Sequence, residues 1–362
     1  MDRFADCHIH IRGGNFETIE RMLDDVASMG VTDACLLALP FRSVSENLSA
    51  LYWKLKYKKM KLRAFGGLHQ TDRYAAVPYD QQVEKLLELG FDGIKLMDMN
   101  PLLRRINGRG VDHCAYDKMF DLLEERETPV LMHANDPKEY WVSPANLTGK
   151  GEYTLPEYES YETIYQETLE MLRKHPRLNI VLAHFFFLAH DPEKAEWFLD
   201  SFPNVKLDLT PGTEMYHQFA EKIDVWHDFF CKYRNRILFG TDTNTYKDFN
   251  KEINQLVYTT LIHDHSEFTM PCYGGYQIRG LGLEEEVVKR ICYGNYVDFV
   301  GEEPRNADMD RFRQAAEAIL IDMKKVPQDP YYERAGEIFP YLRKDPKQEI
   351  SIRFFEGALA RL

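Results

Sequence analysis

The feature of this sequence that most constrains its fold is a regular alternation of short apolar runs with longer segments of helical periodicity. Each run is rich in β-branched or other apolar residues and ends in polar ones. The eight predicted strands are Arg3 to His10, Asp33 to Pro40, Lys61 to His69, Gly93 to Met99, Pro129 to Ala134, Asn179 to Phe186, Val205 to Thr210 and Ile237 to Thr243. Eight strand and helix pairs in strict alternation predict parallel strands joined by right-handed crossovers, the pattern of a closed (β/α)8 TIM barrel.

A helix is predicted behind each strand. The eight segments are Phe16 to Met29, Ser43 to Tyr57, Asp80 to Leu89, Ala115 to Arg126, Tyr161 to Lys174, Pro192 to Asp200, His217 to Lys232 and Asp248 to His263. A length of 362 residues suits one barrel with an extension better than two domains. We therefore expect a barrel over residues 1–300 and a helical extension over 301–362, with an amphipathic helix at Met309 to Met323 that caps the barrel or joins subunits.

Charge and cysteine usage narrow the range of partners. The chain has 45 basic and 58 acidic residues, a net charge of −13, which argues against nonspecific binding to nucleic acid or to anionic membranes. No apolar run approaches the roughly 18 residues of a membrane span. The six cysteines are scattered without a Cys-x-x-Cys pair, as in reduced cytoplasmic proteins. We expect a cytoplasmic protein with a small-molecule substrate, and a homo-oligomer is left open.

The first predicted strand ends in Asp6-Cys7-His8-Ile9-His10. Because side chains alternate along a strand, His8 and His10 are expected on one face, with Asp6 one step lower, and Cys7 and Ile9 on the face toward the helices. Two imidazoles side by side are half of a site for a divalent metal ion.

Polar residues also close or lie near the ends of other strands. They are His69 on the third strand, Lys95 on the fourth, His133 on the fifth, His184 on the sixth and Asp242 on the eighth. Catalytic residues of TIM barrels lie at the carboxyl ends of the strands, so these side chains are expected to converge above the barrel axis.

With these motifs the sequence resembles the amidohydrolase superfamily, and most closely its amidohydrolase family 2 branch, over about residues 3 to 300. The resemblance rests on Asp6-x-His8-x-His10, His133, His184, Phe239-Gly240-Thr241-Asp242 and the segment from Gly280-Leu281-Gly282-Leu283 to Gly294-Asn295. It implies a metal-dependent TIM-barrel enzyme.

By position, the family's metal ligands fall on His8, His10, His133 and Asp242, and its catalytic histidine falls on His184. Such a set would hold one divalent ion per chain, zinc or else manganese, with an open position for water. Asp242 could carry the proton of the attacking water, and His184 could orient that water or polarise a carbonyl oxygen. Some relatives carry a carboxylated lysine on the fourth strand that bridges two metals. For Lys95 we expect an unmodified ammonium that is buried or faces the substrate, and a single metal.

Substrate contacts are expected from the connections above the barrel. Arg104 and Arg105, after the fourth strand, would suit a substrate carboxylate, with a solvated arginine-rich loop as the alternative. Tyr140 and Trp141, after the fifth strand, suggest a lid, with packing on the barrel rim as the alternative. His69 is balanced between substrate contact and a hydrogen-bonded structural role.

The predicted function is metal-dependent hydrolysis of a C–O or C–N bond in a small, carboxylate-bearing molecule. Decarboxylation or hydration of a small unsaturated or aromatic carboxylic acid is the alternative, since the family uses one constellation for all three. A TatD-type nuclease is disfavoured because such enzymes have a glutamate where this chain has Lys95. A phosphoesterase of the polymerase and histidinol-phosphatase type also opens with Asp-x-His-x-His, but it needs further His and Glu ligands that have no clear counterpart in this sequence. A non-catalytic metal-binding barrel is a further alternative.

Overall fold

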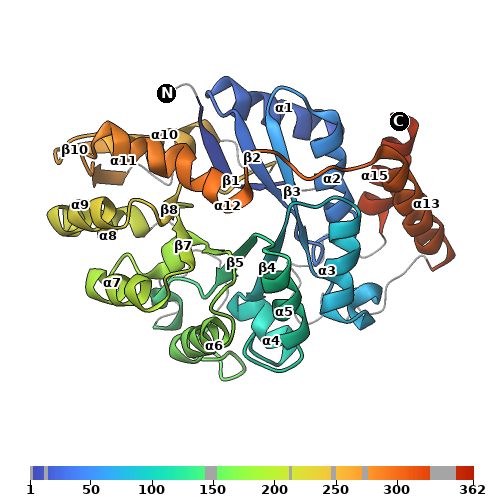
Figure 1. Cartoon of the computed structure of the whole chain (residues 1–362), viewed down its shortest axis with the longest axis horizontal. Coiled ribbons are helices and arrows are strands. Elements are labelled where there is room, and N and C mark those ends of the chain that lie inside the picture. Colours follow the sequence, from blue (N-terminus) through green and yellow to red (C-terminus); the bar gives the residue numbers. More distant parts are fainter. Residues whose placement is uncertain are drawn as a thin grey trace.

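The strands form a parallel barrel surrounded by helices, which confirms the predicted fold (Figure 1). The computed structural model describes residues 3–11, 15–142, 153–211, 214–245, 250–270, 276–326 and 348–362. The barrel strands are β1 (Ala5–His10), β2 (Asp33–Leu37), β3 (Lys61–Gly67), β4 (Gly93–Met99), β5 (Val130–Ala134), β6 (Ile180–Leu182), β7 (Val205–Asp208), β8 (Ile237–Leu238) and β9 (Thr243–Asn244). All eight predicted strands are present, and the eighth corresponds to both β8 and β9.

The last strand closes the barrel in two pieces. β8 pairs with β7, whereas β9 pairs with β1 through Ile9–Thr243 and His10–Asn244. Between the two pieces, the Cys7 amide donates a hydrogen bond of 3.0 Å to the Phe239 carbonyl. The predicted continuous strand is interrupted because Asp242 adopts a left-handed backbone, with φ of 53°.

Helices cover the outside of the barrel. They are α1 (Phe16–Ser28), α2 (Glu46–Lys56), α3 (Tyr79–Glu88), α4 (Pro101–Asn107), α5 (Asp117–Glu125), α6 (Tyr161–Lys174), α7 (Pro192–Ser201), α8 (Met215–Glu221), α9 (Ile223–Lys232), α10 (Asn250–Ile262), α11 (Glu285–Lys289) and α12 (Asn295–Val300). Helices are present in all eight predicted segments, but the seventh is divided into α8 and α9 at Lys222, which has a non-helical backbone. The described part of the eighth begins at Asn250. The antiparallel hairpin of β10 (Glu267–Met270) and β11 (Tyr276–Arg279) and the short helix α4 were not predicted.

Cys7 lies inside the barrel, so the prediction that it faces the helices is wrong. It packs in the interior cluster with Ala5, Cys35, Leu37 and Phe65. The reason is a register shift between Asp6 and Ile9 in the β1–β2 pairing, which breaks strict alternation. Tyr296 and Phe299 of α12 belong to the same cluster, so α12 packs against the residues that fill the barrel.

The carboxyl-terminal segment adds α13 (Met309–Lys325) and α15 (Glu349–Ala360), which lie beside α2 (Figure 1). α13 confirms the predicted amphipathic helix; Phe312, Ala316 and Met323 form its buried face. The division of the chain at residue 300 and a role of this extension in oligomers stay predictions. Among the described residues, no helix has the length and apolar character that a membrane crossing requires.

Candidate metal centre

The irregular end of β1 is held by Asp6. Its carboxylate accepts hydrogen bonds from the His8 amide at 2.9 Å and from the Thr241 hydroxyl at 2.5 Å. Burial raises the pKa of Asp6 to about 7, and this effect is larger than the opposing effect of the two hydrogen bonds. Asp6 therefore fixes the backbone of His8 and joins β1 to the segment between β8 and β9, rather than contacting a histidine ring.

The rings of His8 and His10 are both oriented through their Nδ1 atoms. His8 Nδ1 lies 2.8 Å from the Asp208 carboxylate, and His10 Nδ1 lies 3.1 Å from the Leu37 carbonyl oxygen. A carbonyl oxygen only accepts, so His10 carries its proton on Nδ1, and an ionised Asp208 favours the same tautomer for His8. Both Nε2 atoms then present lone pairs, and they lie only 3.2 Å apart.

Asp242 completes a three-residue group with these histidines. Its Oδ1 atom lies 3.3 Å from His10 Nε2 and 3.8 Å from His8 Nε2. One ligand atom from each residue falls within 4.8 Å of the others. Because Asp242 lies in the break between β8 and β9, the left-handed turn there presents its carboxylate toward the end of β1.

This donor set fits a divalent metal ion. Two imidazole nitrogens bound to one ion at about 2.1 Å with tetrahedral angles lie roughly 3.4 Å apart, close to the observed spacing of the Nε2 atoms. A cation between the lone pairs would remove their repulsion, and the carboxylate would supply the negative charge that such sites favour. The carboxylate partner of His8 and the carbonyl partner of His10 match the outer partners that metal-binding histidines usually have.

Asp208 was missed in the sequence. It closes β7 as the other site residues close their strands, and this position was the available signal. Its second oxygen accepts hydrogen bonds from the backbone amides of His184 at 2.8 Å and Thr210 at 3.1 Å. One buried carboxylate therefore orients His8 and anchors His184.

His184 begins a left-handed turn, where the sequence predicted that β6 continues to Phe186. His184, Phe185, Phe186 and Phe187 all have φ between 51° and 55°. Left-handed backbone costs L-residues roughly 1–2 kcal/mol each. Packing of Phe185 and Phe186 in the core offsets this strain. Backbone strain of this kind clusters at functional sites.

The turn places His184 between two other strand-end histidines. Its ring centroid lies 5.5 Å from that of His8 and 4.8 Å from that of His133. Burial, and then the neighbouring His133 and His8, lower the pKa of His184 well below its usual value. Its Nδ1 atom lies 3.2 Å from the Thr210 carbonyl oxygen, so the neutral ring donates from Nδ1 and keeps a lone pair on Nε2.

His133 lies beside this group but is not part of it. Its Nε2 atom lies 3.3 Å from the Asn100 amide nitrogen and 3.4 Å from Asp136 Oδ1. The structure thus brings His133 to His184, and its predicted role as a fourth ligand stays a prediction.

The comparison with protein families matches the amidohydrolase model over residues 5–300. The chain belongs to the amidohydrolase family. It is therefore an enzyme, and its described residues include a His/Asp group able to bind a metal ion, as the metal dependence of the family requires. A search of curated proteins gives no match.

Solved structures share the fold of this amidohydrolase. An uncharacterized TIM-barrel protein from Bordetella bronchiseptica is 16% identical, covers 82% of this chain and 98% of its own, and has a TM-score of 0.53. A 2,6-dihydroxybenzoate decarboxylase bound to 2,6-dihydroxybenzoate is 17% identical, with 83% and 98% covered and a TM-score of 0.51. A 4-oxalomesaconate hydratase from Rhodopseudomonas palustris is 13% identical, with 87% and 98% covered and a TM-score of 0.51.

Lys95 of the amidohydrolase is buried on β4. It lies level with Gly67 on β3 and with Leu131 on β5, and Leu131 belongs to the barrel interior. The positive charge of Lys95 also acts on the interior thiol of Cys7. Burial raises the pKa of this thiol, and Lys95 opposes part of that rise. The lysine therefore lies in the barrel, below the strand ends.

The two arginines predicted to contact substrate are engaged by acidic side chains of the protein. Arg104 forms a bidentate ion pair with Glu167 of α6, at 2.8 and 2.6 Å. Arg105 contacts Glu157 at 3.4 Å and lies over the Tyr158 ring. These contacts join α4 to the segment around α6, which differs from the solvated arginine-rich loop considered as the alternative, and substrate contact by either arginine stays a prediction.

Tyr140 and Trp141 lie in a short 3-10 helix, Lys138–Trp141. Trp141 packs against Tyr153 and donates from its indole nitrogen to the Glu159 carbonyl at 2.9 Å. Lys138 and Glu139 of this helix line the same small cavity as His184, which places the aromatic segment at the rim of the site. Residues 143–152 of the predicted lid lie outside the described residues.

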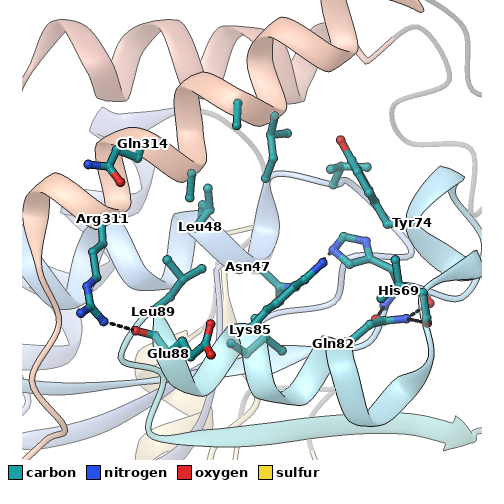
Figure 2. A pocket seen from close by; sticks show the side chains of 16 residues that line it. Asn47, Leu48, His69, Tyr74, Gln82, Lys85, Glu88, Leu89, Arg311 and Gln314 are labelled. Carbon is teal, nitrogen blue, oxygen red and sulfur yellow. Dashed lines mark hydrogen bonds between the residues drawn. The ribbon is translucent and has the colours of Figure 1, made fainter.

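His69 lies in a different cavity, of about 920 Å³, between α2, α3 and α13 (Figure 2). Its Nδ1 atom lies 2.7 Å from Asp72, and Asn47 lies 3.5 Å from its Nε2 atom. The strand-end histidines of β1, β5 and β6 do not line this cavity. The observed contacts match the hydrogen-bonded structural alternative for His69.

Proposed function

We propose that this amidohydrolase is a metal-dependent hydrolase of a small molecule, with the ion held by His8, His10 and Asp242. The observation that carries the proposal is the pair of Nε2 atoms 3.2 Å apart, each with its Nδ1 atom engaged by an outer partner. Zinc suits two imidazoles and a carboxylate best, and manganese is the second choice. Three protein ligands leave coordination positions open.

The chemistry assigned to each group follows from its surroundings. A divalent ion at this site would lower the pKa of water toward neutrality and so supply hydroxide. Asp242 is partly exposed, so a substrate can approach its carboxylate, which would take up a proton and return it to the leaving group. His184 is neutral with a free lone pair on Nε2, so it would accept a hydrogen bond from the attacking water rather than polarise a carbonyl oxygen.

The engaged arginines favour hydrolysis over decarboxylation. Decarboxylation requires a group that holds the carboxylate of the substrate near the ion while a proton reaches carbon. Arg104 and Arg105 would have to leave Glu167 and Glu157 to serve in this way. For Arg104, this would break both charge-assisted hydrogen bonds to Glu167 and leave a mostly buried guanidinium without them.

Decarboxylation or hydration is the second candidate, and Lys95 is the observation that favours it. A buried ammonium within the barrel could attract a carboxylate bound above it. Proteins that share this fold include the 2,6-dihydroxybenzoate decarboxylase and the 4-oxalomesaconate hydratase. The same cation would serve a hydrolase whose substrate carries a carboxylate.

The deciding experiment is turnover of the zinc-loaded enzyme in water enriched in oxygen-18. A panel of lactones, esters, amides and aromatic or unsaturated carboxylic acids is screened, and products are analysed by mass spectrometry with detection of carbon dioxide. We expect one labelled oxygen per turnover, located in a newly formed carboxylic acid, and no carbon dioxide. Label in an alcohol formed at a carbon–carbon double bond would instead show hydration. Asp242→Asn should abolish turnover, whereas Asp200→Asn, on the surface of α7, should not. Release of carbon dioxide without label in the product would overturn hydrolysis.

A further inference from the structure

A second group of potential metal ligands lies on the helical layer of the barrel. It consists of Asp121 and Glu124 of α5 and His175, which caps the carboxyl end of α6. One ligand atom from each residue lies within 4.8 Å of the other two. His175 precedes β6 and His184 follows it, so the two histidines lie at opposite ends of that strand.

The imidazole of His175 is the observation that distinguishes this group from an ordinary acidic surface. Its side chain is 6% exposed, and its Nδ1 atom is buried without a hydrogen-bond partner in the part of the chain that the structure describes. Burial of a polar atom without a partner destabilises the folded protein. This nitrogen points at two carboxylates, 3.6 Å from Asp121 Oδ1 and 4.0 Å from Glu124 Oε2, too far for hydrogen bonds.

These separations suit ligands that share one ion. Oxygen and nitrogen ligands bound to zinc at about 2.1 Å with tetrahedral angles lie roughly 3.4 Å apart. The two distances from His175 Nδ1, 3.6 and 4.0 Å, are slightly longer than this spacing, and the exposed Asp121 carboxylate can move toward the other two ligands. An unprotonated imidazole can offer the lone pair of Nδ1 to an ion. We infer that Asp121, Glu124 and His175 form a second zinc site, which joins α5 to α6.

Arg177 is the competing partner in this group. Its amide donates to Glu124 Oε1 at 2.7 Å, which fixes the carboxylate, and its guanidinium lies 3.3 Å from Oε2. The Arg177 side chain is 77% exposed, so the guanidinium can turn into solvent when an ion binds Oε2. With one nitrogen, two oxygens and an exposed Asp121, the site should bind zinc more weakly than the barrel centre.

Zinc binding to chelator-treated protein tests the inference, measured by equilibrium dialysis and elemental analysis. We expect two zinc ions per chain in the wild type, with the weaker site lost or weakened at least tenfold in Asp121→Asn. This variant changes an exposed side chain and should fold normally. Glu125→Gln, the neighbouring exposed carboxylate of α5, is the matched control and should keep both sites.

Dialysis also separates this inference from the function proposed above. If the barrel centre bound no metal, the wild type would bind one zinc and Asp121→Asn none. Asp121→Asn with the same number of sites and the same affinities as the wild type would overturn the second site. Binding only at millimolar zinc would also overturn it.

Discussion

Asp208→Asn should weaken metal binding although Asp208 is not itself a proposed ligand. One oxygen of Asp208 accepts from two backbone amides, and the other lies 2.8 Å from His8 Nδ1. In the variant, the amide oxygen would keep the backbone hydrogen bonds, and the amide NH2 would face His8. His8 could accept that hydrogen bond only by moving its proton to Nε2, which removes the lone pair that faces His10.

Loss of such an outer partner typically costs 10–100-fold in metal affinity, which corresponds to about 1.4–2.7 kcal/mol. The assay is competition for zinc between the protein and a chromophoric chelator, with circular dichroism to verify the fold. Asp200→Asn is the control, because its carboxylate lies on the surface and contacts Tyr233. A zinc affinity of folded Asp208→Asn within twofold of the wild type would refute the role assigned to this carboxylate.

Three further predictions concern single side chains. His184→Asn should retain zinc but lose at least 100-fold in kcat on any substrate found, because the ring is placed to orient water; loss of zinc would instead make it a ligand. Burial raises the pKa of Asp98 from 3.8 to about 6, so its contribution to stability is present below pH 3.8 and declines as the pH rises to about 6. The free energy of unfolding of Asp98→Asn, measured with urea, should therefore rise relative to that of the wild type by up to about 3 kcal/mol between about pH 4 and pH 7. A difference that does not change with pH would contradict this. Arg104→Gln should lower the free energy of unfolding by about 2 kcal/mol, through loss of the pair with Glu167, with KM unchanged; a raised KM with unchanged stability would place Arg104 on the substrate.

The barrel and its helices could be predicted because their signals are local. Apolar runs followed by helical periodicity are read within windows of about twenty residues, and eight such pairs admit few topologies. The candidate ligands His8, His10 and Asp242 could be named because each closes or follows an apolar run, and they meet at the expected end of the barrel.

The features that were missed depend on contacts between distant segments. Asp208 orients His8 across 200 positions of sequence, and no local pattern reports such a pairing. The left-handed turn at His184 is stabilised by core packing of phenylalanines that, read locally, resemble a continuing strand. The register shift in β1 likewise depends on its pairing with β2, and Cys7, which lies within the shifted part of the strand, faces the barrel interior.

The most direct test of the metal centre is an anomalous difference map from crystals of the full chain grown with zinc, recorded at the zinc absorption edge. The account predicts a peak about 2.0–2.2 Å from His8 Nε2, His10 Nε2 and an Asp242 carboxylate oxygen. A map from zinc-saturated crystals with no peak between these three side chains would contradict it.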